Sequence, residues 1–312
     1  MDMYQIGALI KNTRIKQGIS QEDLCQNICT RETLSRIENG KQDPSSFTLN
    51  GLLHRLGLPE SHCQILLGVD DFAAVNLMRE ITELNTCGNY APALKKISAL
   101  EGLCAEMGKT SRTVVSQYIL RAKALAGYYE GEEHKAYTFA EQRAMLTEAL
   151  KLTCPNFKLE NINACLLGEE ETKIINHIAL TYSEDGDYSR AMEIYKKLLE
   201  YIQSRFASNN VNEAMLPLVA YNFSRLLGRE GHPKYAIKVA EAGRRCCVRS
   251  NKCRMLGGLL LNLACCYHDI GEDEKSKELL KDAYFIHKVM ERPRSCELIK
   301  NYAWETFQIE MG

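Results

Sequence analysis

A short pattern centred on glycine recurs after residue 70 and constrains the fold more than any other feature of the sequence. Each copy is a glycine followed, five residues later, by alanine or serine. Residues with the apolar spacing of a helix precede and follow each glycine. The copies begin at Gly88, Gly186, Gly231, Gly271 and, in degenerate form, Gly131. The pattern predicts a series of hairpins, each made of two helices joined by a tight turn.

The two fixed positions of this pattern have different physical roles. Glycine permits the turn, and the small residue lets the paired helices approach each other closely. This is the packing of tetratricopeptide repeats, although the later copies are 45 and 40 residues apart, longer than the usual period of about 34 residues. We therefore expect residues 70–312 to form a right-handed α-solenoid of tetratricopeptide-like hairpins.

The first 69 residues have a different organisation, with short helices separated by caps and breakers. Gly18 is expected to end the first helix, and Ser20 to cap a second. Thr30 can cap a third helix, which Gly40 would close. A fourth helix would follow Ser45, and a fifth would cover residues 60–67. The sequence thus predicts an all-α head of five helices over residues 1–69.

The expected third helix has one apolar and one polar face. At 100° per residue, Leu34 and Ile37 face the core. The opposite face carries Glu32, Ser35, Arg36 and Asn39, with Arg31 and Thr33 at its edges. Taken alone, such a face is typical of a solvated surface helix.

The order and spacing of the whole head decide whether this polar face is only solvated or has a function. The segments Gly18-Ile19-Ser20-Gln21-Glu22-Asp23-Leu24 and Leu34-Ser35-Arg36-Ile37-Glu38-Asn39-Gly40 closely resemble the lambda-repressor-like, or XRE-type, helix-turn-helix domain. The resemblance covers residues 4–67. In such domains the second helix of the pair lies in the major groove and the first crosses the DNA backbone.

This resemblance implies specific roles for residues of the head. Gln21 and Thr30 would contact phosphate, and Arg14 and Glu38 would form a structural ion pair. The residues expected to face the bases are Arg31, Glu32, Thr33, Ser35 and Arg36. Arginine can bind guanine with two hydrogen bonds and a carboxylate can accept from cytosine N4. The head carries seven basic and seven acidic side chains, so DNA recognition must depend on their placement.

Asparagines recur in the first helices of the predicted hairpins, which line the concave surface of such an array. Asn222 and Asn262 each lie 14 residues before the small residue of their hairpin, and Asn176 lies 15 before its own. An amide both donates and accepts, so these side chains could hold a peptide by its backbone. They could equally join neighbouring helices. Arg225, Arg229 and Arg121 are candidates for binding a carboxylate.

An XRE-type head followed by about five such repeats resembles the RNPP group of peptide-responsive regulators of Gram-positive bacteria. The resemblance implies a quorum-sensing transcription factor that works as a homodimer. A short signalling peptide would bind the repeats and reorient the two heads on paired half-sites. We expect the segment from Leu67 to Asp71 to transmit this change.

Other functions are excluded to different degrees by composition and motifs. The net charge is −1, and no signal peptide or apolar run of about 20 residues is present, so we expect a cytoplasmic protein. No nucleotide-binding, hydrolase or zinc-protease motif occurs, so no enzyme, cofactor or metal is expected. Two alternatives stay open: the repeats could bind a protein partner, or they could only dimerise a constitutive repressor.

The 13 cysteines have no spacing that matches a metal site. We interpret them as free thiols. Cys246 and Cys247, flanked by three arginines, are the pair whose surroundings could lower a thiol pKa.

Overall fold

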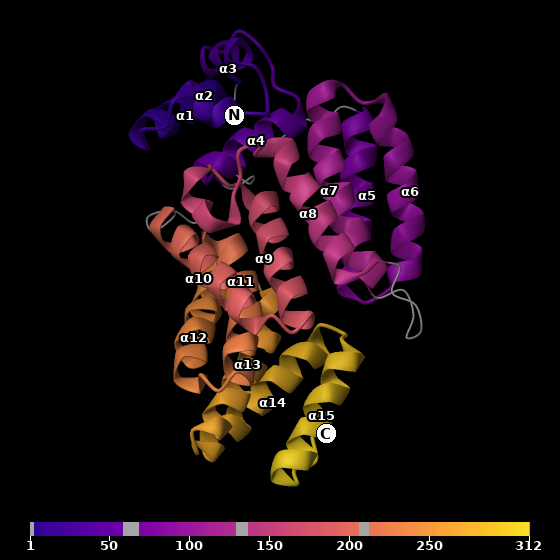
Figure 1. The fold of residues 1–312 in the computed structure, drawn as a ribbon, viewed down its shortest axis with the longest axis vertical. Helices are drawn as coiled ribbons and strands as arrows, with labels where there is room; N and C mark the ends of the chain where they lie inside the picture. The colour runs from indigo at the N-terminus through magenta and orange to yellow at the C-terminus, as the bar shows by residue number, and fades with distance from the viewer. Residues whose placement is uncertain (1–2, 59–68, 129–136, 206–211, 252, 312) are drawn as a thin grey trace. The chain divides into compact units, whose positions relative to one another are not determined.

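The structure, a computed structural model, describes residues 3–58, 69–128, 137–205, 212–251 and 253–311 (Figure 1). Every regular element within these ranges is a helix, which confirms the all-α fold class. By its internal contacts the chain divides into two compact units, Met1–Thr181 and Tyr182–Gly312. The first unit thus includes more than the predicted head, and the boundary at residue 69 stays a prediction.

The head comprises four described helices: α1 (Met3–Lys16), α2 (Gln21–Cys25), α3 (Arg31–Glu38) and α4 (Ser46–Leu56). Ser20 and Thr30 cap α2 and α3, as predicted, because each side chain accepts a hydrogen bond from a backbone amide in the first turn. Ser45 caps α4 in the same way. The fifth helix predicted at residues 60–67 lies outside the described residues.

A compact apolar cluster holds the four helices of the head together. It contains Ile10 of α1, Leu24 of α2, Leu34 of α3 and Leu52 of α4, all fully buried. Leu166, far along the chain, also packs against this cluster. The head and a later loop therefore share an apolar contact within the first unit.

The rest of the first unit consists of further helices, which begin after the undescribed segment 59–68. They are α5 (Val69–Thr86), α6 (Tyr90–Glu106), α7 (Lys109–Tyr128), α8 (Phe139–Thr153), the 3₁₀ helix η2 (Leu159–Ala164) and most of α9 (Glu169–Glu184). Phe47 of α4 is buried in the apolar cluster of α5, α6 and α7. The fourth helix of the head is therefore packed between its own domain and the first repeats.

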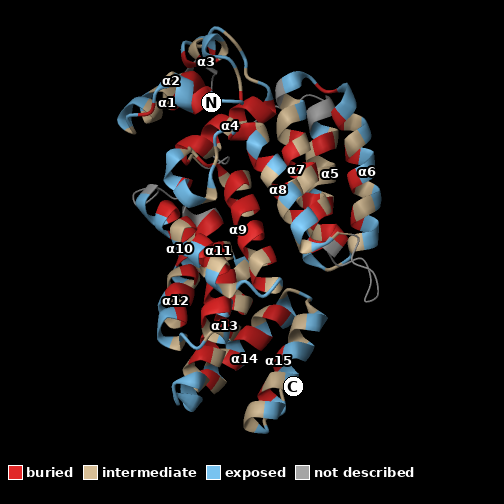
Figure 2. Cartoon of the chain, viewed as in Figure 1, coloured by how far each residue is buried: buried red, intermediate tan, exposed pale blue. Residues whose placement is uncertain are grey.

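The second unit starts at the end of α9 and contains the more regular repeats. Its helices are α10 (Tyr188–Arg205), α11 (Asn212–Arg229), α12 (Pro233–Ser250), η3 (Cys253–Met255), α13 (Leu256–Asp269), α14 (Asp273–Val289) and α15 (Pro293–Phe307). Figure 2 shows buried residues concentrated on the faces where α11, α12 and α13 meet. Consecutive helices from α10 to α15 pack against each other.

The glycine pattern has the expected geometry. Gly88, Gly186, Gly231 and Gly271 all have positive φ values between 75° and 90°, which favour glycine over other residues. The small residues five positions later are completely buried at the helix contacts; they are Ala93, Ala191, Ala236 and Ser276. The predicted hairpins are confirmed at these four positions. The degenerate copy at Gly131 lies outside the described residues.

Candidate DNA-binding face and peptide-binding residues

The polar face of α3 is accessible in the structure. Arg31, Glu32 and Arg36 are exposed, and Thr33 and Ser35 are partly exposed. Leu34 and Ile37 are buried on the opposite side. The five residues predicted to face the bases therefore share one accessible surface, which begins at the N-terminus of α3.

The charges on this face are suited to direct contact with base edges. The backbone amide of Glu32 and the Thr30 hydroxyl lower the pKa of the Glu32 carboxyl, so this side chain is an anionic acceptor. Arg31 approaches Glu22 of α2, with 3.4 Å between Nη1 and Oε1. Both side chains are largely exposed, and exposed ion pairs contribute little to stability. Arg31 can therefore exchange this contact for a base or a phosphate.

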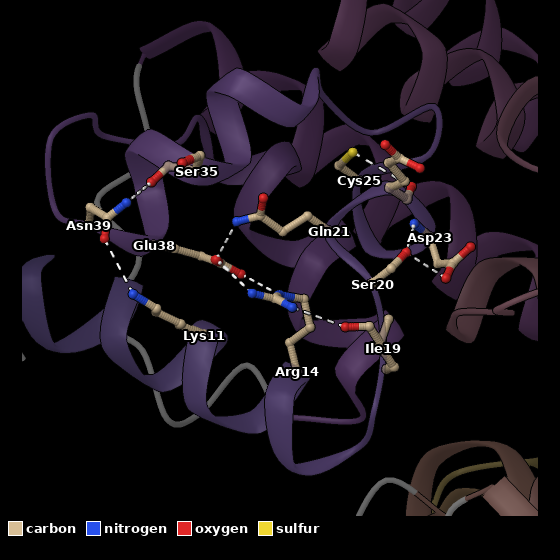
Figure 3. Close-up of polar contacts among 11 residues, drawn as sticks. Lys11, Arg14, Ile19, Ser20, Gln21, Asp23, Cys25, Ser35, Glu38 and Asn39 are labelled. Carbon is tan, nitrogen blue, oxygen red and sulfur yellow. Dashed lines mark hydrogen bonds and ion pairs between the residues drawn. The ribbon is translucent and has the colours of Figure 1, made fainter.

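The recognition helix is fixed in place by a buried carboxylate. Glu38 of α3 accepts two hydrogen bonds from the Arg14 guanidinium of α1, at 2.6 and 3.0 Å (Figure 3). This confirms the predicted ion pair. Arg14 also donates to the carbonyl of Ile19, at 3.0 Å. The network fixes α1, α3 and the loop before α2 relative to each other.

Gln21 takes part in the same network, which the sequence did not predict. Its Nε2 donates to Oε2 of Glu38 over 2.7 Å, and Figure 3 shows the amide directed at the carboxylate. The two helices of the helix-turn-helix pair are thereby joined. Thr30 remains exposed and uses its hydroxyl as the cap of α3. Phosphate contacts by Gln21 and Thr30 stay predictions.

Two peptide-binding candidates, Arg121 and Asn176, belong to the first unit. Arg121 of α7 is paired with Glu170 of α9, with 2.5 Å between Nε and Oε1. Asn176 lies on α9 and is buried beside His177. A peptide carboxylate that bound Arg121 would have to compete with Glu170.

The other four candidates lie in the second unit, on α11 and α13. Arg225 donates to Glu184 over 2.9 Å, and Arg229 donates to the hydroxyl of Tyr188 and stacks on its ring. Both arginine side chains are about half exposed. Asn222 is buried on α11. These three residues of α11 are spaced three and four apart, so they share one face of the helix.

Asn262 of α13 joins neighbouring helices. Its Nδ2 donates to the carbonyl of Tyr221, at 2.8 Å, and to Oγ of Ser224, at 2.9 Å. The amide is buried, and both of its N–H groups therefore go to α11. Of the two roles that the sequence left open for this residue, the structure displays the contact between helices.

The cysteines that the structure describes are all free thiols. Burial raises the pKa of Cys247 to about 11, so the prediction of a lowered pKa at this position was wrong. One of the neighbouring arginines, Arg244, pairs with Glu241. Within the described ranges, no group of three or more His, Cys, Asp or Glu side chains is placed to hold a metal ion.

No described helix has both the length and the apolar character needed to cross a membrane.

Two protein families match this sequence. Residues 10–62 match a helix-turn-helix family. Residues 106–305 match the RNPP family C-terminal domain, and this segment is more than half of the 312 residues. The chain belongs to the RNPP family. A search of curated protein sequences gives no match to this RNPP protein.

Several solved structures share the fold of this RNPP protein. PlcR of Bacillus thuringiensis, in complex with the peptide PapR7 and DNA, has a TM-score of 0.61 at 20% identity, over 96% of this chain and 99% of PlcR. The apo form of PlcR has a TM-score of 0.60 at 18% identity, over 96% and 98% of the two chains. The competence regulator ComR of Streptococcus vestibularis, in complex with its signalling peptide XIP, has a TM-score of 0.51 at 17% identity, over 96% and 97%.

Proposed function

We propose that this protein is a sequence-specific transcriptional regulator of quorum sensing, whose repeats bind a short signalling peptide that alters DNA binding by a homodimer. The observation that carries the DNA half is the exposed face of α3, with Arg31, Glu32 and Arg36, on a helix fixed from behind by buried Glu38. An exposed polar helix of this kind is one of the elements that read base edges in the major groove. Family membership supports the peptide half.

The second unit carries side chains that can bind a peptide. Arg225 and Arg229 present half-exposed guanidinium groups on one face of α11. Glu184, the partner of Arg225, is replaceable by a peptide carboxylate, because exposed ion pairs are weak. The solved relatives PlcR and ComR were crystallised with peptides, which supports the same class of ligand here. The proposal assigns no catalytic activity and places the protein in the cytoplasm, where the DNA lies.

The decisive experiment is binding of the purified protein to the promoter region of its own gene. Footprinting is carried out with and without synthetic peptides encoded by small open reading frames beside that gene. A peptide-dependent change in affinity or footprint supports the whole proposal. Specific binding that no peptide changes supports DNA recognition alone, with repeats that dimerise or bind a protein partner. Absence of specific DNA binding contradicts the proposal.

The proposed peptide binding is tested with a matched pair of variants. Arg225→Ala removes a guanidinium from the proposed peptide-binding face, and Arg245→Ala removes an exposed guanidinium from α12. We expect the first variant to weaken peptide binding about tenfold, as loss of one charge-assisted contact does, and the second to bind as wild type does. Titration calorimetry measures both. Equal peptide affinity in the two variants contradicts a role for Arg225.

A further inference from the structure

Arg55 is a buried arginine in the last turn of α4, with 3% of its surface exposed. Its guanidinium donates to three backbone carbonyls. The distances are 3.0 Å to Leu24, 2.5 Å to Gln26 and 3.2 Å to Thr153. Burying a charge is costly unless its hydrogen bonds are satisfied, so this arrangement needs a reason.

The three carbonyls lie at the ends of two helices. Leu24 is in the last turn of α2, Gln26 follows directly, and Thr153 is the last residue of α8. Carbonyls at a helix C-terminus lack amide partners and carry the negative end of the helix dipole. One guanidinium with five N–H groups can satisfy several of them at once. Arg55 thus joins the C-terminal ends of α2 and α8.

On the side of the head, Arg55 holds the turn that orients the recognition helix. Asn27, in the turn between α2 and α3, has a φ of 57°, in the left-handed region that few residues other than glycine adopt. The carbonyl directly before it, that of Gln26, is the one closest to Arg55. The hydrogen bond therefore fixes the carbonyl next to this left-handed residue, in the turn that leads to α3.

On the side of the repeats, Thr153 belongs to a buried polar network. Its hydroxyl donates to Oε1 of Glu171 and accepts from Nε2 of Gln117, both at 2.6 Å. Oε2 of Glu171 accepts from the amide of Gly168 at 2.9 Å. All these side chains are buried. Thr153 therefore connects α7, α8 and α9, and Arg55 adds α4 to them.

The network adjoins a peptide-binding candidate. Arg121 lies one helical turn after Gln117 on α7, and its partner Glu170 directly precedes Glu171 on α9. The Arg121–Glu170 pair and the contacts of Gln117 and Glu171 with Thr153 are therefore adjacent, and a shift of α9 against α7 disturbs both. Two sites are coupled when both of them bias the position of the same element.

We propose that Arg55 is a positioning residue for DNA recognition, which holds the turn between α2 and α3 and couples it through Thr153 to α7 and α9. The inference rests on the proposed function, because its effect is measured as operator binding. An anionic group that draws Arg121 away from Glu170 changes the contact of α9 with Thr153. The change then reaches the recognition turn through Arg55.

The test of the positioning role compares Arg55→Met with Gln17→Met. Gln17 donates to the carbonyl of Leu56 on α4 at 2.7 Å, so its loss removes a side-chain anchor of the same helix without touching the turn or α8. The readouts are affinity for a fragment of the protein's own promoter and amide hydrogen exchange in residues 24–29. We expect Arg55→Met to weaken binding about tenfold and to raise exchange in the turn. Gln17→Met should change neither.

A conservative variant keeps the test valid if Arg55→Met fails to fold. Arg55→Lys retains the charge but lacks the planar fork that reaches several carbonyls, so we expect an intermediate loss of affinity and raised exchange at residues 24–29. Wild-type protein that binds no DNA specifically overturns the proposed function. Specific wild-type binding that Arg55→Lys fully retains overturns the positioning role alone.

Coupling to the repeats is tested by a double-mutant cycle. Thr153→Val removes the hydroxyl bonds to Glu171 and Gln117 but leaves the carbonyl that Arg55 contacts. If Arg55 acts through α8, the effects of Arg55→Lys and Thr153→Val on operator affinity are not additive. Additive effects overturn the coupling.

Discussion

The carboxylate of Glu38 lies 2.6 Å from Nε of Arg14 and is almost completely excluded from solvent. The pair joins the first helix of the head to its recognition helix. Removing one partner of a buried pair leaves an uncompensated charge, which costs more than the net value of the pair. The ion pair therefore holds α3 in position against α1, in addition to any contribution to stability.

Glu38→Gln is expected to lower the free energy of unfolding of the head by about 3 kcal/mol, because Arg14 loses its counter-charge. The double variant Arg14→Met/Glu38→Leu should lose less, since neither charge then remains buried. Urea denaturation of the two variants and of wild type measures the difference. A double variant that is less stable than Glu38→Gln would contradict this account of the pair.

Arg36→Ala is expected to reduce specific DNA binding while leaving the fold intact. The side chain is exposed on α3, and a bidentate contact with guanine contributes about 1–3 kcal/mol. Lys41→Ala, an exposed position beyond the end of α3, is the matched control. Gel-shift titration against the protected promoter fragment measures both variants. Wild-type affinity in Arg36→Ala rules out this residue as a base contact.

Much of the head and of the repeats was predictable, because local rules determine them. Ser20 and Thr30 cap their helices, and the turn glycines at 186, 231 and 271 adopt positive φ. These features depend on residues within one or two turns of each other. Conformational preference and periodicity are therefore enough to locate them.

The contacts between distant segments could not be predicted in the same way. The partners of Asn262 lie 38 and 41 residues earlier, and Arg55 contacts Thr153, 98 residues later. Periodicity identifies which face of a helix is inward but not which group that face meets. The one signal for Arg55 was its position within the apolar stripe of Leu52 and Leu56. The proposed lever at residues 67–71 begins outside the described residues and stays a prediction.

Asn262→Ala is expected to lower the free energy of unfolding by about 1–2 kcal/mol, since it removes the hydrogen bonds from Nδ2 to the Tyr221 carbonyl and to Oγ of Ser224. The sequence alone predicts that Asn262→Ala and Asn222→Ala together remove the peptide response. Measuring the single variants separates the two effects. Chemical denaturation reports stability, and titration calorimetry reports peptide binding. Unchanged stability in Asn262→Ala would contradict a role in joining α11 to α13.

The stability of the first unit is expected to fall in acid because of His177. Burial lowers the pKa of this imidazole to about 3, and the nearby Arg121 adds to the shift. In the unfolded chain the pKa is about 6.5. Between these values the unfolded state binds more protons, so this stabilisation is complete above about pH 6.5 and is lost as the pH falls toward 3.

His177→Gln should therefore reduce the loss of stability between about pH 7.5 and pH 4.5, by about 2 kcal/mol. His232→Gln, at an exposed turn position, is the control and should behave as wild type. Urea denaturation at the two pH values gives the comparison. The assignment to His177 is lost if its variant keeps the full pH dependence.

Two glycines inside helices of the body are expected to respond oppositely to alanine. A Cβ at Gly243 of α12 would lie 2.7 Å from Cβ of Ala220 and 3.1 Å from Leu259, whereas a Cβ at Gly102 of α6 meets nothing within 4 Å. Gly243→Ala should therefore destabilise the protein by about 1–3 kcal/mol, because the packed helices must separate. Gly102→Ala should stabilise it by up to about 1 kcal/mol through helix propensity. Thermal and urea denaturation measure the stability of both variants. A Gly243→Ala variant more stable than wild type would contradict the close packing of α12 against α11 at this position.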